Sequence, residues 1–196
     1  MQIDIDSLET YNRLARDGAR SAAASLSELT GINVRVQVTN VSLVSPSDLE
    51  YEYLGGNYSG VRIELDGALD GDTVLTFDER ARETIVDVLA PGADEVMQQS
   101  SIEEVGNIMM SGFIDGWADY LEASIEHSPP TYIEKTGKDV LPEAPTADEH
   151  QQVFVFKSAI EWVGESVSFY IYMLPEYEPL ADVMMEHADT DADAIP

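Results

Sequence analysis

The stretch QQSSIEEVGNIMMSGFIDGWADYLEASI, residues 98–125, decides the architecture expected for this chain. At 100° per residue, its apolar side chains gather on one side of a helix, at Ile102, Val105, Met109, Phe113 and Tyr120, with Gly112 and Gly116 among them. Four polar residues gather on the opposite side: Ser100, Glu104, Asn107 and Ser111. The stretch predicts a long helix with one buried face and one polar stripe. Most stripes of this kind are simply solvated helix surface.

The charge of the chain excludes several classes of partner. Its 38 acidic and 10 basic residues give a formal net charge of −28, which repels nucleic acids and anionic membranes. The acidic residues are spread along the sequence and lysine is scarce, a pattern typical of proteins that stay soluble in multimolar salt. There the Debye length is about 3 Å or less, so self-repulsion is screened. We infer a cytoplasmic protein of an extreme halophile. A disordered polyanion is the alternative, and the apolar periodicity argues against it.

Other chemistries find little support in the residues. The chain has no cysteine, and its three histidines, His127, His150 and His187, show no ligand spacing, so we expect no metal site and no cofactor of its own. No apolar run is long enough to span a membrane, and the N-terminus lacks the features of a signal peptide. We therefore expect no membrane insertion.

The order of expected elements repeats. The first half predicts a helix over 7–29, strands over 32–38, 58–65 and 72–77, and a helix over 79–89. The second half predicts the long helix, strands over 131–136, 152–162 and 165–174, and a short helix over 176–187. An acidic loop covers 137–150, and the tail 189–196 is expected to be disordered.

This repetition predicts a single α+β domain over 1–188, sandwich-like and internally duplicated, with repeats of about 7–92 and 98–188. We expect a pseudo-two-fold arrangement with about six strands in a largely antiparallel sheet. The two long helices, which carry the polar stripes, should lie together on one face.

The stripe also matches a known signature. Ser100-x3-Glu104-x2-Asn107-x22-Pro130 fits the pattern (Asp/Ser)-x3-Glu-x2-Asn-x22-Pro of the CheC/CheX/FliY chemotaxis phosphatases, so the chain resembles this family. The order of elements and the internal repeat extend the resemblance to most of the chain. Together with the composition, it indicates a haloarchaeal member.

The resemblance implies an enzyme, a hydrolase that dephosphorylates the aspartyl-phosphate of a CheY-type response regulator. The regulator would hold its own Mg²⁺. Asn107 would position the attacking water, and Glu104 would meet the regulator's lysine. Ser100 would orient Glu104, Ser111 would complete the stripe, and Pro130 would be structural.

The first repeat departs from the signature. An offset of 91 residues places Arg13 at the position of the glutamate and Arg16 at the position of the asparagine, so we expect one active site. Together with Arg20 these residues form an arginine stripe on the first helix. Its ordinary interpretation is local pairing with acidic neighbours. The functional interpretation is a docking surface for an acidic partner.

Two other functions compete with the phosphatase. The first is an adaptor, inactive or weakly active, that binds the receptor deamidase CheD, the regulator or both, as CheC relatives do. The second is a structural role in the flagellar switch, as in FliY, but the chain has no room for the additional switch-assembly domain. The Glu104–Asn107 pair favours the phosphatase, because an adaptor has no need of it.

Overall fold

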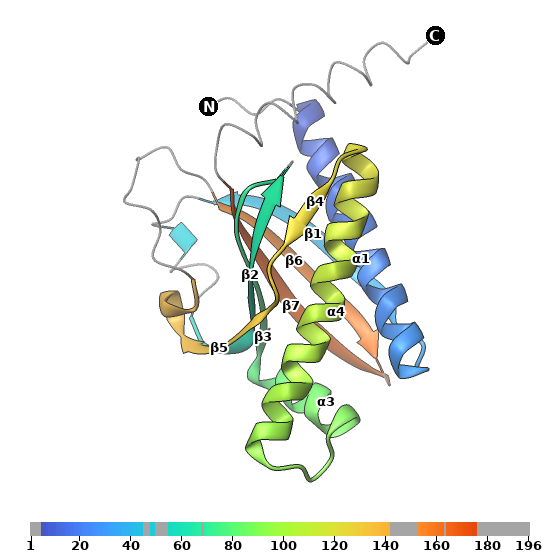
Figure 1. Ribbon diagram of the computed structural model, residues 1–196, viewed down its shortest axis with the longest axis vertical. Helices are drawn as coiled ribbons and strands as arrows, with labels where there is room; N and C mark the ends of the chain where they lie inside the picture. The colour runs from blue at the N-terminus through green and yellow to red at the C-terminus, as the bar shows by residue number, and fades with distance from the viewer. Residues whose placement is uncertain are drawn as a thin grey trace.

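The computed structural model describes residues 5–44, 48–49, 55–67, 69–141, 153–162 and 164–175. Its helices are α1 (Ile5–Thr30), α3 (Glu79–Leu89) and α4 (Glu95–Leu121), with a short 3-10 helix, η1 (Gly137–Val140). Its strands are β1 (Arg35–Val44), β2 (Asn57–Gly67), β3 (Gly71–Asp78), β4 (Ile125–His127), β5 (Thr131–Thr136), β6 (Val153–Trp162) and β7 (Glu165–Pro175). Figure 1 shows one curved sheet with the long helices on one side of it.

The order of the strands has the predicted two-fold symmetry. Neighbours follow the order β1-β6-β7-β3-β2, and the outer edge of β2 pairs with both β4 and β5. Every strand pair is antiparallel. With β5 included, the order is β1-β6-β7-β3-β2-β5. If β1, β2 and β3 exchange places with β5, β6 and β7, respectively, the same order results, read from the other edge of the sheet. Strands β3 and β7 are adjacent at the centre. The α+β class and the internal duplication are therefore confirmed.

Alternation along the central strands gives the sheet two buried faces. In β3, Leu75 and Phe77 join the large core beneath the helices, while Val74 joins a smaller cluster on the opposite face. Strand β7 follows the same rule, with Phe169 in the large core and Tyr172 in the small cluster. The sheet is thus fixed on both sides, and it holds the helix layer rigidly.

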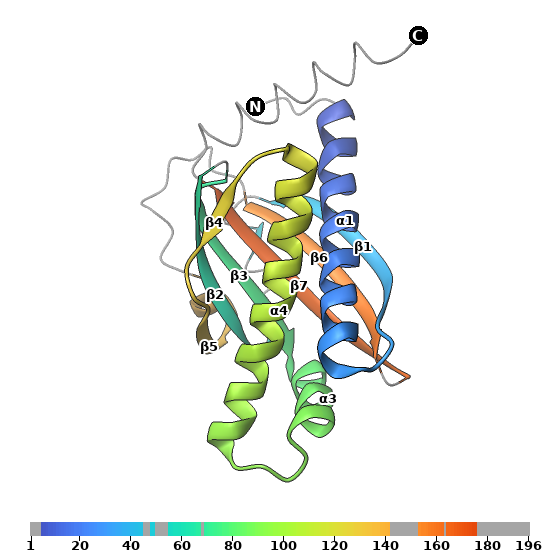
Figure 2. The ribbon, with the colours of Figure 1, turned by 45° about the vertical axis from the view of Figure 1, so that its right-hand side comes forward.

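The two long helices pack against each other through glycine. Figure 2 shows α1 and α4 side by side over the sheet. A Cβ atom at Gly112 would lie 2.7 Å from the backbone of Ala22, and one at Gly116 would lie 3.0 Å from the backbone of Gly18. These two contacts also show that the helices are antiparallel, since a step forward along α4 is a step backward along α1. We call these four residues the glycine seam.

The boundaries of several elements differ from the sequence predictions. The sheet has seven described strands where about six were predicted, because it also contains the three-residue strand β4. Strand β1 begins at Arg35 and continues to Val44, with an irregularity between Val36 and Val38 that breaks the expected alternation. Helix α4 begins earlier than predicted and ends at Leu121, because Glu122 adopts the left-handed conformation (φ 49°). The predicted helix 176–187, the tail and most of the 137–150 loop lie outside the described residues.

We expect Gly112→Ala to lower the free energy of unfolding by about 1–3 kcal/mol, because the added methyl group meets backbone that cannot rotate away. The better helix propensity of alanine offsets part of this cost, by about 1 kcal/mol. Denaturant unfolding in high salt measures the change. Gly55→Ala is the matched control, since a Cβ atom there meets nothing within 4 Å. A Gly112→Ala variant as stable as the wild type would contradict the seam.

Candidate functional site

The polar stripe lies on a helix whose start and end are both well defined. The Asp94 side chain caps α4 by accepting a hydrogen bond from the backbone N–H of Met97 at 3.0 Å. At the other end, the backbone N–H of Glu122 bonds to the carbonyl oxygens of Ala118 and Asp119. These caps fix the residues at which α4 begins and ends.

The predicted division of α4 into two faces is observed. Ile102, Met109 and Phe113 are fully buried in the core. On the stripe, Ser100 and Glu104 are exposed, while Asn107 and Ser111 are half-buried. The carboxylate and the carboxamide are three residues apart and therefore adjacent on the same face. The structure thus places the four predicted residues along one accessible strip of helix.

Asn107 follows Gly106, a residue at which α4 closely approaches the sheet. A Cβ atom at Gly106 would lie 2.7 Å from both methyl groups of Val61 in β2, so only glycine allows this approach. Strand β5 pairs with β2 here, Tyr132 opposite Val61. Asn107 is consequently held at the boundary between helix and sheet, which limits its movement. Gly106 was not singled out from the sequence, although a glycine within a helix is a recognisable signal.

The site residues are not engaged by their own chain. Within the described residues, the side chains of Ser100, Glu104 and Asn107 make no hydrogen bond or ion pair. The expected bond from Ser100 to Glu104 is therefore absent, and the orienting role of Ser100 stays a prediction. By contrast, the neighbouring Ser101 hydroxyl bonds back to the carbonyl oxygen of Met97 at 2.9 Å. The Glu104 carboxylate and the Asn107 carboxamide are thus available to another molecule.

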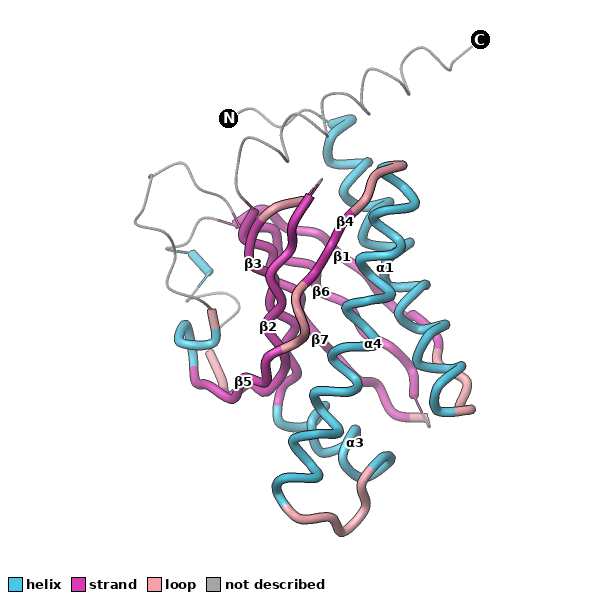
Figure 3. The backbone as a smooth tube through the Cα atoms, viewed as in Figure 1, coloured by secondary structure: helices cyan, strands magenta, loops and turns pink. Residues whose placement is uncertain are grey.

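Pro130 lies at a break in the edge of the sheet. Strand β4 ends at His127 opposite Leu65, and β5 begins at Thr131 opposite Arg62. Two residues of β2 therefore face the three residues of segment 128–130, a bulge that Figure 3 shows as a loop between two short strands. The Ser128 hydroxyl accepts the backbone N–H of Glu64 at 3.0 Å. Because proline has no N–H to donate, Pro130 suits this break, in line with its predicted structural role.

The arginine stripe lies at the other end of the helix layer. Arg13, Arg16 and Arg20 are exposed on α1. Because the helices are antiparallel, they lie beside the C-terminal half of α4, away from Glu104 and Asn107. Arg20 pairs with Asp17 at 3.2 Å on the surface, which agrees with the ordinary interpretation of local pairing.

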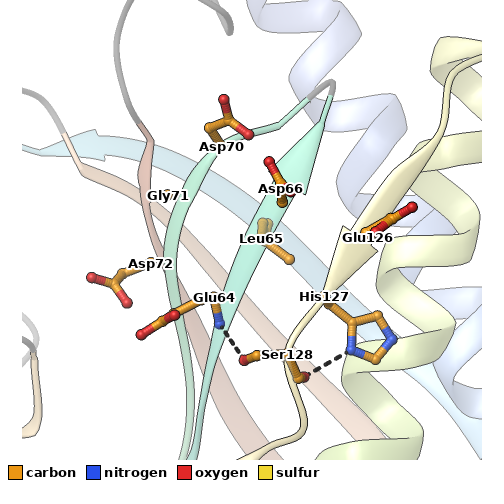
Figure 4. A pocket seen from close by; sticks show the side chains of 9 residues that line it. All are labelled: Glu64, Leu65, Asp66, Asp70, Gly71, Asp72, Glu126, His127 and Ser128. Carbon is orange, nitrogen blue, oxygen red and sulfur yellow. Dashed lines mark hydrogen bonds between the residues drawn. The ribbon is translucent and has the colours of Figure 1, made fainter.

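Two of the hollows that the described residues line lie outside the stripe. The larger, about 640 Å³, is lined by carboxylates and His127 at the ends of β2, β3 and β4 (Figure 4). Within the described residues no group of three or more His, Asp or Glu side chains is arranged to hold a metal ion. The smaller, about 420 Å³, lies between α3 and the ends of β2 and β5.

Arg82 in the smaller hollow links α3 to the site helix. Its Nη2 donates to Gln98 Oε1 at 3.2 Å, near the start of α4. Close by, the Tyr132 hydroxyl donates to Glu134 Oε2 at 3.0 Å, and burial is the main cause that raises the pKa of Tyr132. Sequence analysis did not identify Arg82, because only the fold brings it to α4.

Known proteins are similar to this chain in sequence. A family model described as the CheC-like family matches residues 97–134, the range from the polar stripe to just beyond Pro130. Over 188 residues the chain is 32% identical to the Halobacterium salinarum protein named "Putative CheY-P phosphatase CheC1", covering 93% of this chain and 96% of that one.

Solved structures share the fold. FliY of Thermotoga maritima superposes with a TM-score of 0.79 at 20% identity, covering 97% of this chain and 99% of that chain. The FliM middle domain of H. pylori superposes with a TM-score of 0.69 at 11% identity, covering 93% and 99%. At these identities the likeness shows the fold alone.

Fold and stripe together define a class: an internally duplicated α+β protein that presents one unengaged polar helix face. The chain belongs to the CheC-like family, because its identity to the Halobacterium protein extends over almost its whole length. Within the described residues, no helix is long and apolar enough to cross a membrane.

The close approach at Gly106 is testable without an activity assay. We expect Gly106→Ala to destabilise the fold, because its methyl group collides with Val61. In Gly106→Ala/Val61→Ala the smaller residue makes room, so the two changes should be coupled favourably by about 0.5–3 kcal/mol. A double-mutant cycle of unfolding free energies measures the coupling, and additive effects would contradict the contact.

Proposed function

We propose that this protein hydrolyses the aspartyl-phosphate of a CheY-type response regulator and so resets a chemotaxis signal. The observation that carries the proposal is the pair formed by the exposed Glu104 and the half-buried Asn107. Their side chains are adjacent on one helix face and unengaged within the described residues. The name of the Halobacterium relative supports the same substrate.

The proposed reaction needs few catalytic groups from the phosphatase itself. A water oxygen forms a bond to phosphorus while the bond from phosphorus to the aspartate oxygen breaks, giving aspartate and inorganic phosphate. The carboxylate of an acyl phosphate is already a good leaving group, and the regulator supplies Mg²⁺ and a lysine to balance the charge. What remains is to hold the water in line with the breaking bond, which is a task of positioning.

Asn107 suits this positioning task. Its carboxamide oxygen can accept a hydrogen bond from the water while the water's lone pair faces phosphorus. The amide is neutral, so it can approach a phosphoryl group without repulsion. The contact of Gly106 with β2 holds the backbone beside it in place, so the amide is pre-positioned.

The Glu104 carboxylate is suited to form an ion pair with a cation of the partner. A carboxylate that enters a site with a phosphoryl group is repelled unless it meets a positive charge, and the regulator's lysine provides one. Because Glu104 lies one turn before Asn107, both side chains can enter one pocket together. Ser100 and Ser111 extend the strip as supporting polar contacts, and Pro130 keeps the adjoining edge of the sheet in shape.

The proposal places a single site on α4 in a protein of the cytoplasm, where response regulators act. The equivalent positions of α1 hold Arg13 and Arg16, which can neither accept a hydrogen bond from water nor pair with a lysine. The net charge of −28 suits solution at multimolar salt.

We expect Asn107→Ala to reduce phosphate release from the phosphorylated regulator by about 10²-fold or more, because the water loses its orientation. The measurement is single-turnover release of inorganic phosphate in high salt, above the regulator's own rate of hydrolysis. Asp115→Ala, at an exposed position of the same helix about two turns beyond Asn107, is the matched control. An unchanged rate of phosphate release in Asn107→Ala would contradict the proposed role of Asn107.

The adaptor alternative predicts a different result from the same assay. A protein that only binds CheD or the regulator would leave the rate of phosphate release at the regulator's own value, with or without Asn107. Binding of CheD by a protein that also releases phosphate would make CheD a second partner rather than the function.

The arginine stripe can be tested in the same way. We expect the triple variant Arg13→Glu/Arg16→Glu/Arg20→Glu to release phosphate at the wild-type rate, since these residues lie at the opposite end of the helix layer. Pull-down with the regulator and with CheD tests the docking interpretation. A loss of either partner would assign that surface a function beyond local pairing.

A further inference from the structure

The large apolar side chains left exposed gather at one end of the helix layer. Among the described residues they are Leu29, Val96 and Met97, which are 57%, 73% and 61% exposed. Leu29 lies in the last turn of α1, and the other two lie in the first turn of α4. We call these three residues the apolar end patch. It lies at the same end of the layer as the polar stripe.

The patch and the stripe share one surface. Val96 and Met97 precede Ser100 by four and three residues, and Met97 precedes Glu104 by seven, so all lie on one side of α4. Continued along both helices, the antiparallel register of the glycine seam places Leu29 at about the level of Val105. Figure 2 shows the first turns of α4 projecting beyond the end of α1. Apolar side chains thus precede and flank the polar pair.

The stability of the helix start does not explain why apolar residues occupy positions 96 and 97. Asp94 is the N-cap, so these residues occupy the second and third positions of the helix, where the helix dipole favours acidic side chains. A glutamate at the position of Met97 would complete a capping box with Asp94. In a chain with 38 acidic residues, two exposed apolar side chains at these positions run against both preferences.

High salt gives apolar contacts an advantage in docking. Exposed charges are screened within about 3 Å in molar salt, so ion pairs at the rim of an interface contribute little. Apolar contacts are not weakened by such screening, and excluded salts strengthen them. An acidic protein that must meet an acidic partner in such a solution gains its affinity most directly from apolar side chains.

We infer that the apolar end patch is the docking contact for the response regulator, against apolar surface at the rim of its phosphorylation pocket. This rests on the proposed function, and it adds the residues that supply affinity to those that position the water. The position of the patch supports this partner, because a body that takes Glu104 and Asn107 into a pocket covers the preceding turn of α4 as well.

The test separates affinity from chemistry. In the Asn107→Ala background, where the substrate is not consumed by the phosphatase, the Kd for the phosphorylated regulator is measured in high salt. Val96→Ser/Met97→Ser should raise this Kd about tenfold or more, as loss of central apolar contacts does. In the otherwise wild-type chain, the same double variant should raise KM and leave kcat unchanged. Val96→Ile/Met97→Leu, which keeps the apolar surface, should restore both values.

Each outcome distinguishes the two claims. Wild-type KM and Kd in Val96→Ser/Met97→Ser, with Asn107→Ala still inactive, would overturn the docking contact and leave the phosphatase standing. A wild-type protein that releases no phosphate but loses the regulator in this variant would overturn the phosphatase and keep the contact. A change in oligomeric state by light scattering, without a change in Kd, would show that a second copy covers the patch and would overturn the inference.

Discussion

The close contact between the backbones of α1 and α4 is the constraint on which the arrangement of this protein depends. With Gly112 against Ala22 and Gly116 against Gly18, the helices approach more closely than larger side chains allow. That approach fixes their antiparallel register and leaves little freedom of rotation about their axes. Each polar stripe is thereby directed outward, and the two stripes are placed at opposite ends of the layer.

Duplication allows the two long helices to present different polar residues from equivalent places in the fold. The strand order is unchanged when the repeats are exchanged, so each long helix has an equivalent place over the sheet. The outward residues of such a helix contribute little to the core, and they can change without cost to the fold. In α4 they are Glu104 and Asn107, while the corresponding residues of α1 are Arg13 and Arg16.

Periodicity in the sequence predicted the elements whose own side chains determine them. Both long helices and the central strands have apolar residues at the right spacing, so their class and order were correct. Strand β4 was missed because its three residues are mostly exposed, and only pairing with β2 makes them a strand. The extension of β1 to Val44 likewise depends on β6. The signature singled out Glu104 and Asn107, and their role stays a prediction. The approach of Gly106 to Val61 and the exposure of Val96 follow from packing alone.

A site of two unengaged side chains makes the chemistry depend on docking. In the proposed reaction the leaving group, the cation and the metal ion all belong to the partner, so Glu104 and Asn107 would act only when α4 is seated in the regulator's pocket. Their rigid support by the glycine seam and the sheet reduces the entropy lost in that step. In molar salt, charge cannot guide the seating over a distance. The proposed apolar contact beside the polar pair would then hold the two proteins in register while water attacks.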